Sequence, residues 1–192
     1  MKRKAQSGIG TLVVFISMIL IAAIAAGVLI QTSSSVQSKA LSAGSKASAQ
    51  VSTAFNIIDV SGTLNTTGKI NHILLTAKLA PGSDAVKLND TVLKFDPPGG
   101  AQAYRYNSSL ESDCNATGLV NEYNIQYLIN GTNHKDGYMQ AGDVVSFCFL
   151  PSSTIIEGIE ISIVLLPKVG SSMEARFRTP DLLVKNREYL FP

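Results

Sequence analysis

An apolar stretch, residues 8–30, opens the chain without a single charged residue, and the charge-free window extends to Lys39. As an α-helix, residues 9–30 measure about 33 Å, which is enough to cross a bilayer's hydrocarbon core of roughly 30 Å. The pattern therefore predicts a helix suited to apolar surroundings. A plain N-terminal membrane anchor is one interpretation of it.

Apolar residues continue beyond this stretch at roughly one per helical turn, with serine and alanine between them. No proline interrupts the chain before Pro81. We therefore predict one helix over residues 6–55, apolar in its first half and amphipathic in its second. Gly44 and the serines lower helix propensity, so the second half is expected to need partners for full order.

From Phe55 the apolar period changes from 3.6 to two, which predicts strands and turns over residues 56–192. The expected strands are residues 70–79, 85–88, 91–95, 123–129, 138–140, 144–150, 159–165 and 173–177. Short strands at near-regular spacing favour a β-sandwich of immunoglobulin-like type, so the expected fold class is α+β. The tail, residues 181–192, has no clear period, and packing on the domain or on a neighbouring subunit are both open.

A short basic segment, Met1-Lys2-Arg3-Lys4-Ala5, precedes the apolar helix. A secretory signal peptide has its small-residue cleavage site after the apolar region, whereas Ala5 stands before it. Cleavage between Ala5 and Gln6 would remove residues 1–5 as a leader and leave the apolar helix at the mature N-terminus. An uncleaved signal anchor is the alternative.

Small residues recur at four-residue spacing inside the apolar helix, Ala22 with Ala26 and Ala23 with Gly27. Such pairs allow helix backbones to approach closely, which favours association where the surroundings are already apolar. A lone anchor gains nothing from such a face. We therefore expect the helix to pack among copies of itself.

The segment KRKAQSGIGTLVVFISMILIAAIAAGVLIQTSSSVQSKA resembles the N-terminus of archaellins, the subunits of the archaeal flagellar filament, a family similar to type IV pilins. The positions that match the family pattern are Gly8, Gly10, Thr11, Leu12, Val14, Phe15 and Ile16. Two positions depart from related patterns. Ala5 stands where the family has glycine before the cut, and Gly10 stands where bacterial-type pilins have glutamate.

The resemblance implies a filament subunit with a β-sandwich outer domain, and residues 158–180 are similar to that family's final hairpin. The precursor is expected in the cell membrane with its basic leader inside and its β domain outside. A leader peptidase would free the helix, and an ATP-driven membrane platform would move it from lipid into a homo-polymer that serves swimming. The alternatives are an adhesive type IV pilus-like fibre and a membrane-anchored binding domain that never polymerises.

Composition changes this picture little. The net charge is only +2, and half of the first six residues are basic, which argues against a nucleic-acid-binding surface. His72 and His134 stand alone, without a catalytic relay or metal-ligand spacing. No glycine pair has the strand-turn-helix setting of a phosphate loop. We therefore expect a protein that is not an enzyme and binds no cofactor.

Two cysteines, Cys114 and Cys148, lie in the C-terminal part of the chain. If that part is extracellular, a disulfide closing a loop of about 35 residues would add roughly 3–4 kcal/mol of stability. Two unpaired thiols are the alternative.

Five N-x-[ST] motifs are present, which is more than chance predicts, and all lie in expected turns or loops of the β domain. They begin at Asn65, Asn89, Asn107, Asn115 and Asn130. N-linked glycans on an exported surface are the functional interpretation, and ordinary turn asparagines are the alternative.

Overall fold

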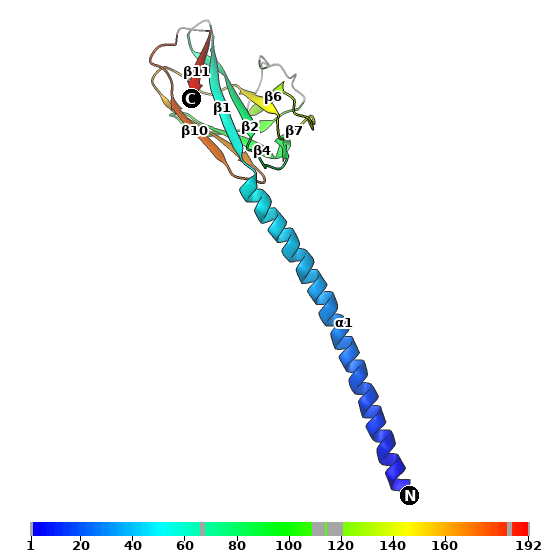
Figure 1. Ribbon diagram of the computed structural model, residues 1–192. Helices are drawn as coiled ribbons and strands as arrows, with labels where there is room; N and C mark the ends of the chain where they lie inside the picture. Colours follow the sequence, from blue (N-terminus) through cyan, green and yellow to red (C-terminus); the bar gives the residue numbers. More distant parts are fainter. Residues whose placement is uncertain (1, 66–67, 109–113, 115–120, 184–185, 192) are drawn as a thin grey trace. The chain divides into compact units, whose positions relative to one another are not determined.

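The protein, seen in a computed structural model, is described over residues 2–65, 68–108, 114, 121–183 and 186–191, with side chains described from residue 8 onward. The chain divides into two compact units, Met1–Ala47 and Ser48–Pro192. Figure 1 shows the helical first unit in blue and the β-rich second unit in cyan to red.

The first element is a single helix, α1 (Lys2–Ser52), of 51 residues. Its length agrees with the absence of proline, since no residue in it removes a backbone donor from the i→i−4 ladder. The helix ends three residues before the expected position 55, and Ala54 already forms an isolated β-bridge with Ser171. Every described residue from 8 to 48 in this helix is exposed.

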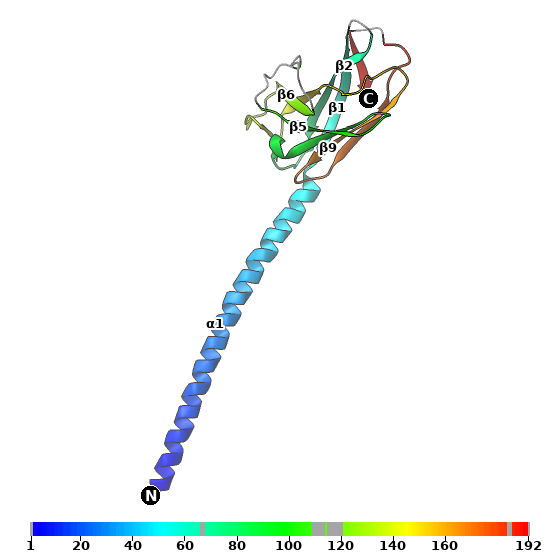
Figure 2. The same ribbon diagram turned by 180° about the vertical axis from the view of Figure 1, so that it is seen from behind.

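Nine strands of the described residues form one hydrogen-bonded sheet (Figures 1 and 2). They are β1 (Phe55–Leu64), β2 (Ile70–Leu79), β4 (Thr91–Asp96), β5 (Gln102–Tyr106), β6 (Glu122–Ile129), β8 (Val144–Phe149), β9 (Glu160–Pro167), β10 (Met173–Arg178) and β11 (Arg187–Phe191). Their spatial order is β10-β9-β4-β5-β6-β8-β2-β1-β11. Two short strands, β3 (Val86–Lys87) and β7 (Tyr138–Met139), pair separately beside a 3-10 turn, η1 (Leu88–Asp90).

This sheet is mixed and almost closed. β5 and β6 run parallel, whereas the other neighbouring pairs of the sheet are antiparallel in the described residues. β10 contacts both β1 and β11, so the two ends of the sheet nearly meet. The expected arrangement of a long helix followed by a β-rich domain is confirmed. A β-sandwich has two separate sheets, whereas here hydrogen bonds connect all nine strands into one nearly closed sheet.

Aromatic side chains fill the interior of the sheet. The ring of Phe147 lies edge-on to that of Phe55, with centroids 6.4 Å apart, and 5.5 Å from that of Tyr123. Phe149 contacts Phe95 in the same way at 5.5 Å. Buried Tyr123 also donates its hydroxyl to the carbonyl of Thr91 (3.0 Å), which satisfies the polar end of the ring. Burial raises the pKa of this phenol.

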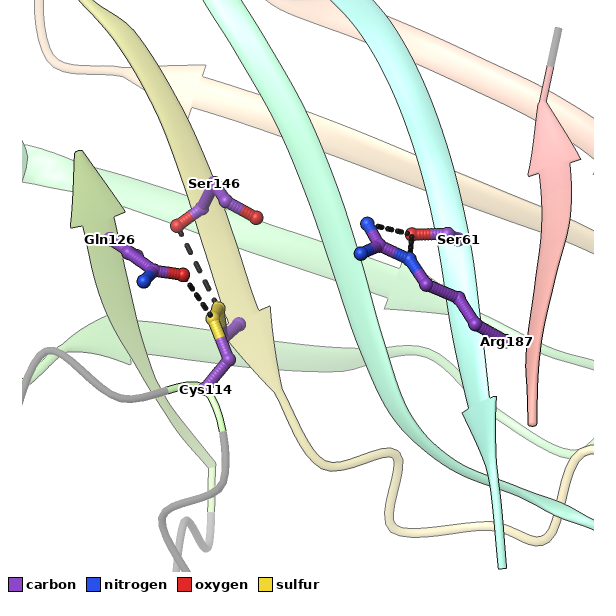
Figure 3. The surroundings of a disulfide bond; sticks show 6 residues. Ser61, Cys114, Gln126, Ser146 and Arg187 are labelled. Atoms are coloured by element: carbon purple, nitrogen blue, oxygen red, sulfur yellow. Dashed lines mark hydrogen bonds between the residues drawn. A yellow bond between two sulfur atoms is a disulfide. The ribbon is translucent and has the colours of Figure 1, made fainter. Parts of the chain in front are cut away.

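Strands β5 and β11 lie in segments without a clear apolar period, where no strand was expected. Each has one buried residue, Tyr104 in β5 and Leu190 in β11, so neither shows a period of two. β11 pairs with β1 at one end of the sheet, which gives the tail its place on the domain. There the side chain of Arg187 donates from Nε (3.0 Å) and Nη2 (2.9 Å) to the buried hydroxyl of Ser61 (Figure 3).

Two hydrogen bonds to Thr53 connect the start of the β unit to later segments of the chain. The carbonyl of buried Thr53 accepts from the amide of Ser171 (2.8 Å), and its hydroxyl accepts from the amide of Asp84 (3.2 Å). Gly170 has φ +120°, and a Cβ there would stand 2.6 Å from the carbonyl oxygen of Thr53. Glycine is therefore required at this close approach.

Candidate assembly surface and modification sites

The first candidate site is the apolar surface of α1. Its large apolar side chains between positions 9 and 30 are 49–71% exposed. They are Ile9, Leu12, Val13, Val14, Phe15, Ile16, Met18, Ile19, Leu20, Ile21, Ile24, Val28, Leu29 and Ile30. A soluble monomer rarely exposes so continuous an apolar surface, so this helix requires other molecules around it. By length and composition it is able to cross a membrane.

The predicted packing face lies on this exposed surface. Ala22, Ala23, Ala26 and Gly27 are all exposed in the isolated chain. Among the described residues, no atom comes within 4 Å of the place where a Cβ on Gly27 would stand, the helix's own neighbouring backbone aside. A mid-helix glycine costs about 0.5–1 kcal/mol relative to alanine. Within the described helix, Gly27 is therefore open to close approach by another molecule.

Hydroxyl groups on α1 bond to its own backbone. Thr11 donates to the carbonyl of Gly8 (2.9 Å), and Ser17 donates to that of Val14 (2.8 Å). Thr32 does the same with Val28 at 2.6 Å. These polar groups are therefore satisfied within the helix, as an apolar environment demands.

The predicted cleavage position, Ala5 and Gln6, falls inside α1, but the side chains of residues 2–7 lie outside the described part. The backbone continues as helix through this position. The proposed cleavage bond therefore lies within helical backbone.

A disulfide joins Cys114 to Cys148, with 5.4 Å between their Cα atoms (Figure 3). Cys148 is fully buried on β8, and Cys114 belongs to the connection between β5 and β6. The sulfur of Cys114 lies 3.7 Å from Oε1 of Gln126 on β6. The bridge thus fastens the β5–β6 connection onto the face of β8 that does not point to the aromatic core.

The five glycosylation motifs have different surroundings. Asn89 and Asn130 are exposed, and Asn65 is exposed while its Oδ1 accepts from the amide of Lys69 (3.0 Å). The motif at Asn65 continues into residues 66–67, which lie outside the described part, as does Asn115. Asn107 is half-buried, and its Nδ2, the atom that would carry a glycan, donates to Glu122 at 2.6 Å.

The turn that follows Asn130 is held by one buried carboxylate. Asp143 accepts from the amides of Gly131 (2.7 Å) and Gln140 (2.9 Å), and its Oδ1 lies 3.5 Å from Nδ1 of His134. A Cβ on Gly131 would stand 2.8 Å from a backbone oxygen. This network joins residues that are up to 12 positions apart in the sequence. In the sequence, Gly131 is the one residue that hints at it. Among the described residues, no three His, Cys, Asp or Glu side chains gather as a metal site.

Comparison with known proteins agrees with this arrangement. The profile of the family described as archaeal-type flagellin matches residues 5–177. Flagellin B3 of Halobacterium salinarum is 34% identical, over 94% of this chain and 91% of that protein. Flagellin B1 of Natrialba magadii is 30% identical, over 96% and 94%.

Solved structures share the fold. The archaeal flagellum of Methanospirillum hungatei aligns with a TM-score of 0.71 at 15% identity, over 96% of this chain and 99% of that chain. Archaeal flagellin FlaB1 from Methanocaldococcus jannaschii aligns with a TM-score of 0.63 at 16% identity, over 72% and 96%. With the exposed apolar helix, the family match means that the chain is an archaeal-type flagellin, a non-enzymatic structural subunit that polymerises into the extracellular archaellum filament.

Proposed function

We propose that this flagellin is made as a membrane precursor and matures by loss of residues 1–5 between Ala5 and Gln6. The apolar helix would lie across the bilayer with the basic residues on the cytoplasmic side, because positive charge is retained there. A leader peptidase that cuts before the apolar region leaves the helix on the mature subunit. The helix of membrane-crossing length and its basic start support this step.

One observation carries the proposal: the fourteen large apolar side chains between residues 9 and 30 that α1 leaves exposed. Exposing each such side chain to water would cost about 1.5–3 kcal/mol. A direct transfer from lipid to a core of identical helices avoids that cost, and the hydrophobic contribution changes little between the two. Packing must then select the filament, and a membrane assembly platform would move the subunit.

The packing face would be Ala22, Ala23, Ala26 and Gly27. In apolar surroundings helices associate through van der Waals contact, so small residues that admit a second backbone are favourable. The open position at Gly27 supports this assignment.

Residues 56–192 would form the outer domain, with N-linked glycans on its surface. Oligosaccharide transfer requires access to the amide nitrogen, and among the described residues exposed Asn89 and Asn130 meet that requirement best. The bond from Asn107 to Glu122 opposes modification of the folded domain at that position. Rotation of such a filament would give swimming.

Mass spectrometry of the N-terminus in native filaments tests the maturation step. We expect a first residue at Gln6. An intact Met1 would instead identify an anchor that is never processed, and a different first residue would move the cleavage bond.

The packing face is tested by Ala23→Leu, which adds bulk where a second backbone should approach. We expect loss of filaments with unchanged thermal unfolding of the detergent-solubilised monomer. Ala25→Leu is the matched control, since it makes the same change more than a third of a turn from the centre of the small-residue face. Filaments of normal length from Ala23→Leu, or equal losses from both variants, would contradict this face.

A further inference from the structure

The second half of α1 carries a polar stripe that the assembly face does not use. Lys39 and Lys46 are seven residues apart, which at 100° per residue places them within about 20° of one another around the helix. Thr32 and Gln50 continue the same line, and all four side chains are exposed. Val36 and Ala47 lie on the adjoining side, so the helix has an apolar side for contact with other helices and a charged side next to it.

Another copy of α1 provides no partner for these two lysines. The first 58 residues contain no aspartate or glutamate, so helix-to-helix contact would place ammonium groups against apolar or like-charged surface. Burial of an unpaired ammonium is strongly unfavourable, and like charges repel. The stripe must therefore face something other than α1 in the polymer.

The outer domain has the opposite charge. Residues 59–192 hold all 14 acidic residues of the chain against 11 basic ones, a net charge of −3. Residues 6–58 hold Lys39 and Lys46 alone, a net charge of +2. In a polymer of identical subunits, the outer domains of neighbouring copies are the part of the protein with a net negative charge that could receive these lysines.

One carboxylate stands out by its place near the start of the β unit. The backbone amide of Asp84 donates to the side-chain hydroxyl of Thr53 (3.2 Å), seven residues after Lys46 in the sequence. Its side chain is exposed and takes part in none of the ion pairs among the described residues. Asp90, nearby in sequence, is already 3.4 Å from Lys168.

We propose that the stripe of Thr32, Lys39, Lys46 and Gln50 docks on the outer domain of a neighbouring copy, where Asp84 of that copy pairs with Lys46. The inference rests on assembly through α1, and it adds a second contact that fixes how neighbouring subunits are turned around the filament. Charge pairs of this kind contribute to register and specificity more than to bulk affinity.

The test uses the full-length subunit in cells that lack their own copy. Lys46→Glu is expected to lower the amount of filament at least about ten-fold, since it opposes Asp84 with a like charge. Lys69→Glu is the control, because it makes the same change of net charge in the turn at the other end of β1. Adding Asp84→Lys to Lys46→Glu restores the opposite charges and is expected to restore filaments.

A covalent readout tests proximity directly. In filaments that carry Lys46→Cys together with Asp84→Cys, oxidation is expected to give dimers and higher multimers. Rescue with cross-linking supports the proposal. Wild-type filament levels from Lys46→Glu would overturn it, and so would loss of filaments with neither rescue nor cross-linking. Failure of helix assembly itself is recognised separately, because it appears in Ala23→Leu and is not rescued by charge.

Discussion

The helix α1 and the β unit are both rich in apolar residues, but they differ in where those side chains lie. In the β unit Leu75, Phe95 and Phe147 are completely buried. In α1 Phe15 and Ile24 are 64% and 68% exposed, as are their neighbours to a similar degree. The β unit completes its hydrophobic burial within one chain, whereas the helix depends on other molecules for it. Stability of the fold and stability of the polymer are therefore separable properties of one sequence.

Two phenylalanine truncations give the strongest test of this separation. Phe147→Ala removes a ring from contact with Phe55 and Tyr123, and should lower the unfolding free energy of the β unit by about 3–5 kcal/mol. Phe15→Ala on the exposed helix should leave that free energy unchanged and reduce filament formation. Denaturant unfolding of detergent-solubilised monomer and sedimentation of filaments measure the two effects.

The separation would fail if Phe15→Ala destabilised the monomeric β unit, since that result requires contacts between the helix and the domain. Phe149→Leu is a milder companion in the core, expected to lower stability less than Phe147→Ala because most of the buried volume is kept.

The disulfide sharpens the comparison, since it adds stability within the β unit alone. Cys114→Ser should lower the unfolding free energy by about 3–4 kcal/mol, because the unfolded chain loses a cross-link over 34 residues. Reductant should destabilise the natural protein by a similar amount and leave the variant unchanged. Equal melting of oxidised and reduced natural protein would show that the bridge contributes nothing.

A smaller effect is expected from pH. His72 on β2 is partly buried, its Nε2 has no hydrogen-bond partner among the described residues, and burial lowers its pKa from the ordinary 6.5. The unfolded chain therefore binds a proton at His72 more tightly than the folded chain does. The contribution of neutral His72 to the unfolding free energy is complete above pH 6.5 and declines as the pH falls below that value. Melting temperatures between about pH 7.5 and about pH 5.5 should fall less for His72→Gln. Parallel curves would contradict the role of His72.

Much of the fold could be predicted from patterns within single stretches of the sequence. The absence of proline and charge predicted the helix, and alternation predicted the bounds of β2, Ile70–Leu79, as observed. The isoleucines of β9 point inward as their spacing indicates, with Ile161, Ile163 and Leu165 buried. These elements share a period that one stretch of chain displays by itself.

Pairings distant in sequence were beyond that kind of signal. On β8, Ser146 and Cys148 alternate with the aromatic residues, and they are buried as the aromatic residues are. The bridge from Cys114 reaches this second face from 34 residues away in the sequence. The candidate sites followed the same division. The small-residue face was visible as spacing, whereas the bond that restrains Asn107 depends on Glu122 across a parallel pair of strands.

The inward hydroxyl bonds of α1 have a mechanical consequence. Between residues 8 and 30 the polar side chains are those of Thr11 and Ser17, and both donate to carbonyls one turn back. This apolar segment therefore presents no side-chain donor that must change partners when its surroundings change. Moving this segment between acyl chains and a bundle of identical helices then exchanges one set of dispersion contacts for another, with no added polar barrier in either direction. For residues 8–30 the transfer is therefore reversible in polar terms.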